Sequence, residues 1–510
     1  MASEVLRLVQ GINLEPVHEE FTLDCRLLFM GDRYRQLVRA YPEVIHRLSR
    51  PKPTAEIAAF LRESAEIAQY YAISSDARKV AVTLRDDIFK EPQPLTSLDC
   101  RLKIGRRGRF TELPLPLSRL KPLGRLVPLL QGSHTRADVE RGLVDFQADD
   151  RQWATDLLRT LEAGGCLETG PAQDNYFLKS SARPRTSFVA HTSILVQTRG
   201  ASILTDPLIR PSLKTPREAL DVTRLDLTAI CLTHAHWDHC DVQSLLLFDK
   251  RVTVVVPRVH TPTIFNPPMV PMLRMLGFTD IREVDPWDRI HLGDVQMRLV
   301  PFHGEQDEPG AEIDHYTYVF QSDGLSVYGG VDSFRDTHGE MRESLARVRA
   351  EHQPTVAFLP ISRMVYAYRD GGVNGFCRYM DTSLLDQSFQ YTAGPSEATE
   401  WVRELGVSTV VPYATFTFNP RATPGEVVDF AQALDRVGLG THLLPLATLG
   451  AVEPSDLDGS ARALRRRRSL RRWFTTGASA SRLDRRLKQI PVYRFARRLV
   501  AGRESAVHHH

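Results

Sequence analysis

The sequence predicts an α/β protein whose strands end in loops that carry polar side chains. Short segments rich in β-branched and apolar residues recur from about residue 190 onward, and their length is typical of strands. Several of them run directly into Asp, His or paired Gly residues. The first 180 or so residues instead contain stretches with apolar residues at helical spacing. The predicted strands are 191–196, 202–205, 229–232, 295–300, 325–328, 356–360 and 409–416.

Four metal-binding side chains lie directly after strand 229–232. They are His234, His236, Asp238 and His239. Two imidazoles at positions i and i+2 of an extended backbone point the same way, so both can bind one metal ion. Asp238 and His239 follow as the chain turns, and we expect them to reach a second ion beside the first. A lone His is usually a surface or core residue, whereas several nitrogen and oxygen donors that converge on one point indicate a metal site.

Two further strand ends supply candidate carboxylates. Asp206 ends strand 202–205, and we expect it to hold a ligating His from the side away from the metal. Asp332 follows Gly329 and Gly330 at the end of strand 325–328. An Asp in this position can bridge two cations, and we expect its small neighbours to leave room for them.

Together these segments resemble the metallo-β-lactamase fold family over about residues 186–450. The matching signatures are Thr205-Asp206-Pro207, the His-x-His-x-Asp-His motif at 234–239, and the later Gly-Gly-x-Asp at 329–332. The resemblance implies an αββα sandwich, in which two mixed sheets are flanked by helices. It does not fix the reaction, because this fold hosts hydrolases, nucleases, oxidoreductases and oxygenases.

The sequence departs from the hydrolase pattern of this family at two positions. Hydrolases usually supply a third His from the loop where this chain has His303 and Glu305, and a late His where this chain has Tyr413. Glu305 is placed to be a ligand, whereas Tyr413 is a poor replacement for an imidazole. The resulting donor set contains more hard oxygen ligands than a zinc hydrolase site, and such ligands favour iron and manganese. His303 could still serve as the third His, which keeps a zinc hydrolase as the alternative.

This pattern is similar to the di-iron β-hydroxylase family of chloramphenicol biosynthesis. The stretch Pro301–Gln306 and the two-domain length support the likeness. The resemblance implies an O₂-dependent non-haem di-iron oxygenase of antibiotic biosynthesis that hydroxylates an amino-acid-derived substrate held on a carrier domain. It implies two Fe ions and no catalytic side chain beyond their ligands, where the alternative is two Zn ions. The implied ligands are His234, His236 and Glu305 on one ion, Asp238 and His239 on the other, and Asp332 between them.

Electrons for such a reaction must come from an external donor. The sequence carries no Gly-rich dinucleotide fingerprint and no cysteine cluster for an iron–sulfur centre.

We expect four segments along the chain. Residues 1–183 form a mainly helical N-terminal domain for dimerisation or docking, and residues 184–455 form the catalytic domain. Residues 456–507 form a basic tail, and residues 508–510 are the remnant of a purification tag. The predicted helices of the N-terminal domain are 55–71, 117–130, 137–146 and 153–163, and a short strand at 166–168 suggests a winged-helix unit. We favour a homodimer or carrier contact over nucleic-acid binding for this domain.

The composition favours a cytoplasmic enzyme. Apolar residues make up 42% and charged residues 25% of the 510 residues, as in globular proteins with a sizeable core. No apolar run approaches the roughly 18 residues of a transmembrane segment, and residues 1–10 lack the apolar stretch of a signal peptide. The six cysteines are scattered without a Cys-x-x-Cys motif, which favours reduced thiols.

The C-terminal segment is strongly basic. Residues 461–507 contain 15 Lys and Arg against 2 Asp and Glu, which gives a net charge of +13 in a chain whose total is +3. Such a segment attracts an acidic partner, such as an acidic carrier domain or an anionic membrane surface. Nucleic acid is a less favoured partner, and a disordered tail that aids solubility is the alternative.

Overall fold

The computed structural model describes residues 4–8, 12–16, 71–75, 80–84, 100–106, 109–172, 184–209, 220–260, 266–303, 315–336, 339–362, 392–413, 424–444 and 451–453. It also describes short strands at 365–367, 379–381 and 388–390, and single positions at 56, 59, 62, 63 and 446. Glu305 and the basic tail lie outside these residues, as does most of the predicted helix 55–71, of which positions 56, 59, 62 and 63 are helical.

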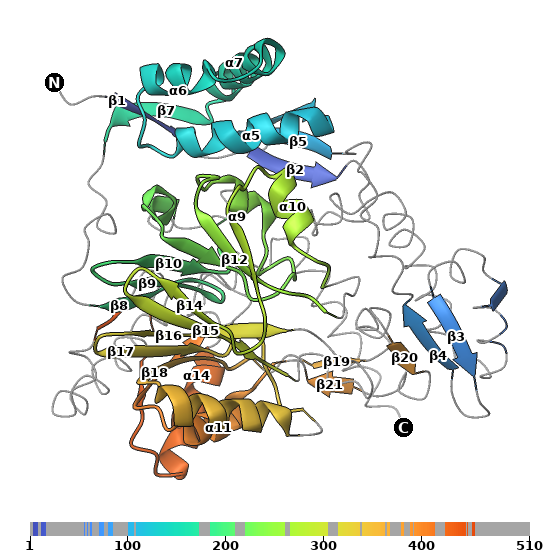
Figure 1. Ribbon diagram of the computed structural model, residues 1–510, viewed down its shortest axis with the longest axis vertical. Coiled ribbons are helices and arrows are strands. Elements are labelled where there is room, and N and C mark those ends of the chain that lie inside the picture. Colours follow the sequence, from blue (N-terminus) through green and yellow to red (C-terminus); the bar gives the residue numbers. More distant parts are fainter. Residues whose placement is uncertain are drawn as a thin grey trace, which may run out of the picture.

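Two seven-stranded sheets form the centre of the structure (Figure 1). The first sheet has the order β13-β12-β11-β10-β9-β8-β24, and the second has the order β14-β15-β16-β17-β18-β22-β23. The bounds in the first sheet are β8 Arg185–Ala190, β9 Ser193–Gln197, β10 Ser202–Thr205, β11 Ala229–Cys231, β12 Thr253–Pro257, β13 Ile281–Val284 and β24 Ala451–Val452. Those in the second are β14 Arg289–Leu292, β15 Val295–Pro301, β16 Tyr316–Ser322, β17 Leu325–Gly329, β18 Val356–Pro360, β22 Thr409–Tyr413 and β23 His442–Leu443. The predicted strands therefore form as expected, with ends shifted by a few residues.

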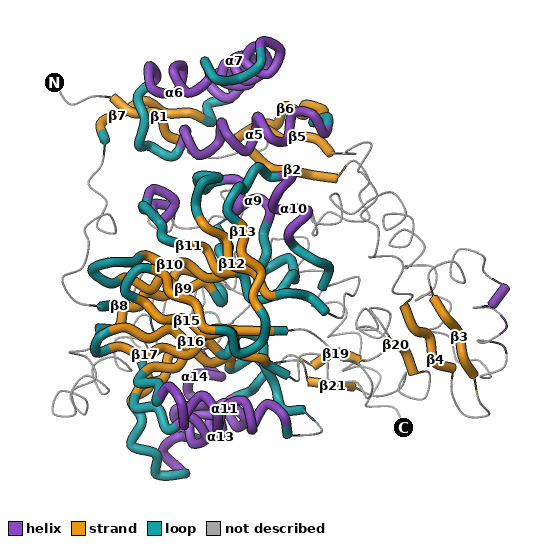
Figure 2. Tube along the Cα trace, in the orientation of Figure 1, coloured by secondary structure: helices purple, strands orange, loops and turns teal. Residues whose placement is uncertain are grey.

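Helices cover the outer faces of both sheets, so the strands are buried on two sides. Helices α9 (Val242–Leu246) and α10 (Val270–Met275) lie outside the first sheet, and α11 (Glu340–His352), α13 (Pro395–Leu405) and α14 (Pro424–Arg436) lie outside the second (Figure 2). One apolar core lies between the sheets and another lies under each helical layer. Burial on both faces explains why the central strands read as continuous apolar runs. This architecture confirms the predicted αββα sandwich.

The described N-terminal region combines helices with strands. The predicted helix 117–130 consists of a short turn at Leu117–Arg119, helix α5 (Leu120–Leu126) and a turn at Val127–Leu130. Helix α6 (Arg136–Leu143) begins at Thr135, where a reciprocal pair of hydrogen bonds with Asp138 caps it, and α7 (Ala148–Ala163) ends at Gly164. These helices confirm the predictions at 117–130, 137–146 and 153–163.

Strands complete this region, and of these the sequence analysis predicted only the short strand at 166–168, which overlaps β7. Strand β7 (Leu167–Pro171) begins one residue after Cys166 and pairs with β1 (Glu4–Leu8). Strands β2 (Ile12–Pro16), β5 (Cys100–Arg106) and β6 (Arg109–Pro114) form a three-stranded sheet. The winged-helix assignment stays a prediction.

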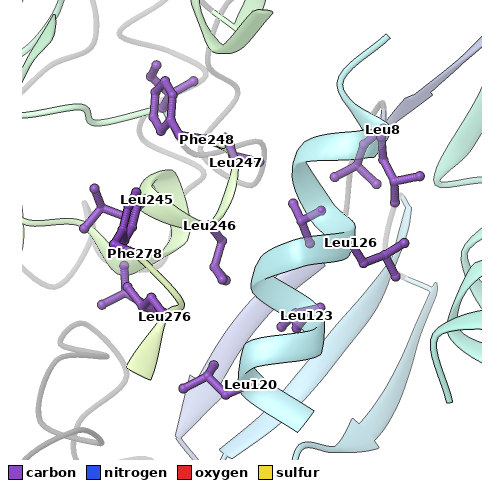
Figure 3. Close-up of a cluster of buried hydrophobic side chains, with 14 of the residues drawn as sticks. Leu8, Leu120, Leu123, Leu126, Leu245, Leu246, Leu247, Phe248, Leu276 and Phe278 are labelled. Carbon is purple, nitrogen blue, oxygen red and sulfur yellow. The ribbon is translucent and has the colours of Figure 1, made fainter. Parts of the chain in front are cut away.

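The N-terminal region packs on the outer layer of the first sheet through helix α5. Figure 3 shows the buried leucines of α5 facing Leu246, Leu276 and Phe278, which belong to the same apolar cluster. The contact is close at Gly124, because a Cβ at this position would lie 2.3 Å from the carbonyl oxygen of Leu276. Only a residue without a side chain fits there.

Lys250 lies buried beside this contact. Its Nζ donates hydrogen bonds to the carbonyl oxygens of Leu245 (2.9 Å), Leu246 (3.1 Å) and Phe248 (2.5 Å), and it stands over the ring of Phe278 at 4.7 Å. Burial lowers the pKa of Lys250 to about 7.

A second pairing joins segments far apart in sequence. Strand β4 (Val80–Leu84) lies between β3 (Tyr71–Ser75) and β20 (Tyr379–Asp381), and both pairings are antiparallel. Strand β20 follows the short strand β19 (Val365–Ala367), which pairs with β21 (Ser388–Gln390). Figure 1 places the β3–β4–β20 group to one side of the sandwich.

Among the residues with a described position, no helix is long and apolar enough to cross a bilayer.

Candidate metal centre

Strand ends from both sheets bring the candidate donors together. Strands β10 and β11 are parallel, and their register places Thr205 beside Cys231, so Asp206 and the segment that begins at Thr233 leave the sheet side by side. Strand β17 of the second sheet ends at Gly329, shortly before Asp332. The carboxyl ends of parallel strands are a common place for functional side chains in α/β sheets.

Four buried side chains form a cluster with the geometry of a metal site. One ligand atom from each of His191, Asp238, His239 and Asp332 lies within 4.8 Å of the other three. His191 Nε2 is 3.1 Å from Asp238 Oδ2, and His239 Nε2 is 2.9 Å from Asp332 Oδ2. The set offers two imidazoles and two carboxylates around one point, which suits a divalent metal ion.

Three imidazoles form an adjoining group. The ring centroids of His234 and His236 are 4.4 Å apart, and the ring of His315 lies 4.7 Å from the first and 5.0 Å from the second. The His234 ring is 4.0 Å from that of His239, which connects the two groups. Phe302 packs edge-on against His234 at 5.6 Å and forms an apolar wall.

Asp206 orients His239 from behind. One Asp206 oxygen accepts a hydrogen bond from the Thr233 amide (2.8 Å), and the other accepts one from the Thr233 hydroxyl (2.6 Å). That second oxygen also lies 3.1 Å from His239 Nδ1, and the Thr192 hydroxyl lies 3.1 Å from the same nitrogen. With Nδ1 engaged on this side, Nε2 faces Asp332. Metal-ligating histidines in proteins usually have such a carboxylate partner on the other ring nitrogen.

Two buried tyrosines hold the turns that carry the donors. The Tyr318 hydroxyl donates a hydrogen bond to the carbonyl oxygen of Leu232, two residues before His234. The Tyr413 hydroxyl accepts a hydrogen bond from the Val331 amide, directly before Asp332. Both rings belong to the core between the sheets, so packing of this core positions the donors.

The paired glycines make room for protein atoms. A Cβ at Gly329 would lie 3.3 Å from the Tyr413 hydroxyl oxygen, and a Cβ at Gly330 would lie 2.9 Å from a ring carbon of Pro360. The backbone therefore needs these glycines in order to pass β18 and β22, and the room that we expect them to leave for metal ions stays a prediction.

Strained backbone is concentrated around the site. Five non-glycine residues of the described chain have a positive φ, and three of them are His191 (47°), Asp206 (36°) and Val331 (51°). Positive φ is uncommon for side chains other than Gly, and it is an outlier for a β-branched residue such as Val. Strain of this kind is found where a structure fixes functional groups.

The charges of the cluster are strongly coupled. Burial alone would raise the pKa of Asp238, but the imidazoles of His239 and His191 outweigh it and lower that pKa. Burial alone would lower the pKa of His239, but the carboxylates of Asp332 and Asp238 and the hydrogen bond with Asp206 raise it well above its usual range. The buried carboxylates thus require positive charge nearby, which a divalent cation can supply.

The structure places the predicted site residues as follows. His234 and His236 lie together, Asp238, His239 and Asp332 lie together, and Asp206 contacts His239. Tyr413 contacts the backbone beside Asp332. His303 Nδ1 lies 3.4 Å from the Glu340 carboxylate at the start of α11, and the four-residue cluster of described residues does not include it.

Two residues were missed by sequence reasoning. His191 was assigned to a strand, but it occupies the turn between β8 and β9. His315 lies directly before β16 and was not among the predicted donors. Neither lies in a motif with the other donors, so only the position of His191 directly after an apolar strand could have identified it.

Comparisons with known proteins agree with this fold. Residues 186–311 match the sequence model of the Metallo-beta-lactamase superfamily. Over 176 residues the chain is 31% identical to the 4-amino-L-phenylalanyl-(CmlP-peptidyl-carrier-protein) 3-hydroxylase of Streptomyces venezuelae, and the match covers 33% of this chain and 33% of that protein. The chain therefore aligns with about a third of the length of this curated relative.

Two solved structures are similar over most of the chain. CmlA, a diiron beta-hydroxylase from Streptomyces venezuelae, has a TM-score of 0.56 at 16% identity and covers 89% of this chain and 99% of its own. A mutant of CmlA beta-hydroxylase has a TM-score of 0.59 at 15% identity and covers 88% of this chain and 100% of its own. Residues 186–311 are therefore similar in sequence to the metallo-β-lactamase superfamily, and the chain shares the fold of CmlA over most of its length.

Proposed function

We propose that this protein is an O₂-dependent non-haem di-iron oxygenase that hydroxylates an amino-acid-derived substrate in natural-product biosynthesis. The observation that carries the proposal is the carboxylate-rich donor set at the strand ends, in a chain that is similar in sequence to a 3-hydroxylase. Hard oxygen donors favour iron over zinc. A reduced iron pair supplies the activation of O₂ that hydroxylation of an unactivated carbon requires.

The proposed ligands keep the assignment that the sequence implies. His234, His236 and Glu305 would hold one iron, Asp238 and His239 the other, and Asp332 would lie between them. The adjoining His234 and His239 rings support two neighbouring ions. Asp206 would orient His239 through its contact with Nδ1, and Phe302 packs edge-on against the ring of His234.

We propose that the substrate arrives on an acidic carrier domain. The name of the curated relative gives an aminoacyl group on a peptidyl carrier protein as its substrate. The net charge of +13 in residues 461–507 complements an acidic partner and would raise the rate of encounter. An external donor would supply the electrons.

Metal analysis and isotope labelling test the reaction. Protein purified without added metal should contain two irons per chain, and label from ¹⁸O₂ should enter the product. Two zincs with full activity, or label that enters from water, would refute the oxygenase. Glu305→Ala should remove one iron, and His303→Ala should retain both.

A zinc hydrolase is the second candidate, and one observation favours it. His315 brings a third imidazole to His234 and His236, and three imidazoles with an open position are typical of catalytic zinc. If this candidate is correct, His315→Ala should abolish zinc binding at the first site while Glu305→Ala does not.

Deleting residues 461–507 tests carrier docking. We expect lower turnover of a carrier-bound substrate, mainly at low ionic strength, because salt screens charge attraction. Metal content should stay the same. Equal rates for free and tethered amino acid, together with full activity of the truncated chain, would exclude the carrier.

A further inference from the structure

We propose that His191 is a protein ligand of the second metal ion, together with Asp238, His239 and Asp332. This inference rests on the proposed function only in requiring a metal at the site, and it holds for iron or zinc. It assigns a role to a residue outside the His-x-His-x-Asp-His motif, supplied by the turn that opens the catalytic part of the chain.

The distances are those of neighbouring ligands on one ion. Metal–nitrogen and metal–oxygen bonds are about 2.0–2.2 Å long, so two ligands at right angles lie about 3 Å apart. His191 Nε2 and Asp238 Oδ2 are 3.1 Å apart, and His239 Nε2 and Asp332 Oδ2 are 2.9 Å apart. Both pairs belong to one cluster, in which the four ligand atoms all lie within 4.8 Å of one another.

The backbone holds His191 in place for this task. The side chain is 4% exposed, and its φ of 47° lies in the left-handed region that favours glycine. The bulge between Phe188 and Ala190 in the β8–β9 pairing directly precedes it. Such bulges re-aim side chains next to functional sites. An ordinary turn would not require a buried His in this conformation.

The position of Tyr413 explains why the second metal site would need a ligand from the first sheet. Tyr413 ends β22 of the second sheet beside Asp332 and offers no imidazole to this site. The Tyr413 hydroxyl is engaged with the Val331 amide. His191 approaches from the first sheet and provides the imidazole that the late strand does not.

A competing role for His191 is to donate a hydrogen bond to Asp238 without touching the metal. Replacing His191 by Gly and adding back small imidazoles separates the two roles. Glycine suits the positive φ and leaves a cavity. Imidazole can act both as a ligand and as an N–H donor, whereas 1-methylimidazole keeps the ligand nitrogen but has no N–H to donate.

The measurement is an anaerobic titration with Fe²⁺ followed by calorimetry, repeated with Zn²⁺. Wild-type protein should bind two ions, and His191→Gly should bind the second at least 100-fold more weakly. Both imidazole and 1-methylimidazole should restore the second ion. His352→Gly is the matched control, because His352 is also 4% exposed but lies at the end of α11, where it forms a hydrogen bond with Gln321 of β16. This control should bind both ions normally.

Two outcomes would overturn the ligand role: unchanged binding of the second ion in His191→Gly, or rescue by imidazole alone. If His191→Gly does not fold, His191→Asn decides, because Asn tolerates positive φ and can donate to Asp238 but is a weak ligand. Retention of the second ion in His191→Asn would overturn the proposal, and its loss would support it. If the wild type binds two Zn²⁺ but not two Fe²⁺, the proposed di-iron function fails, while the Zn²⁺ titration still tests His191.

Discussion

The Tyr413 hydroxyl accepts a hydrogen bond from the Val331 amide, which places a core tyrosine one residue from the carboxylate of Asp332. Val331 has a φ of 51°, a conformation that a β-branched residue rarely adopts. The tyrosine therefore stabilises a turn that the local sequence disfavours. The Tyr413 side chain thereby fixes the turn that carries Asp332.

Tyr413→Phe should weaken metal binding while the fold persists. The Val331 amide would be left buried without its partner, which costs about 1–3 kcal/mol, and Asp332 would lose its fixed position. We expect metal affinity, measured by calorimetric titration, to fall about 10-fold. This is the lower end of the loss usually caused by replacing residues that hold metal ligands in place. Tyr328→Phe is the control, because that buried hydroxyl has no hydrogen-bond partner in the described structure; an equal loss there would disprove a specific role for Tyr413.

Asp206→Asn should lower the affinity for the second metal by about 10- to 100-fold. The two carboxylate oxygens of Asp206 contact the Thr233 amide, the Thr233 hydroxyl and His239 Nδ1. The Asn side chain has only one oxygen that can accept a hydrogen bond. Asp241→Asn is a nearby control, because Asp241 caps α9 through the Ser244 amide and Asn caps helices equally well. Metal content by mass spectrometry should separate the two variants, and identical content would count against an orienting role for Asp206.

Gly124→Ala should destabilise the contact between α5 and the catalytic part. Its Cβ would overlap the Leu276 carbonyl oxygen, and relief of such overpacking typically costs about 1–3 kcal/mol. Thermal unfolding should show a lower midpoint, with metal stoichiometry preserved. At Gly170 a Cβ would meet nothing within 4 Å, so Gly170→Ala should leave the midpoint nearly unchanged. If both variants behave alike, the close approach at Gly124 has no energetic consequence.

Stability should rise with pH through the titration of Lys250. Burial lowers the folded-state pKa of Lys250 to about 7, below its usual value of about 10.4 in an unfolded chain. Between these values the unfolded state binds more protons, so the free energy of unfolding increases with pH, by at most about 1.4 kcal/mol per pH unit. Unfolding of the wild type and Lys250→Met should therefore diverge from pH 7 to pH 9. If the difference in unfolding free energy between the two proteins stays constant with pH, the three carbonyl oxygens keep the Lys250 amine protonated.

The sequence predicted those parts of the site that depend on local order along the chain. His234, His236, Asp238 and His239 follow one strand, and their alternation already indicates which way the imidazoles point. The contact of His191 with Asp238 bridges 47 positions, and no periodicity reports it. The Tyr413 contact with Val331 bridges 82 positions. Each contact joins elements of one sheet, the first sheet for His191 with Asp238 and the second for Val331 with Tyr413. They depend on the order of strands within the sheet, which a single sequence does not encode in any local pattern.

For the fold, too, the sequence predicted individual elements but not all of their partners. Strands of the sandwich were visible because burial on both faces leaves continuous apolar runs. The pairing of Glu4–Leu8 with Leu167–Pro171 was not, because both strands are short and β7 contains polar residues and Gly170. The helices of the N-terminal region were visible through apolar spacing, whereas the cap of α6 at Thr135 was found only in the structure. The pairing of the strands in this region depends on the packing of the whole fold, so the sequence did not predict it.

The pairing of β8 with β24 has a consequence for biosynthesis. Ala451 lies beside Ser187, so a ribosome must add more than 260 residues after Ser187 before this edge acquires its neighbour. All described donors, from His191 to Asp332, emerge earlier, and β1 meets β7 earlier still. Until β24 is synthesised, this edge of the first sheet has no partner strand, and open strand edges invite pairing with other chains.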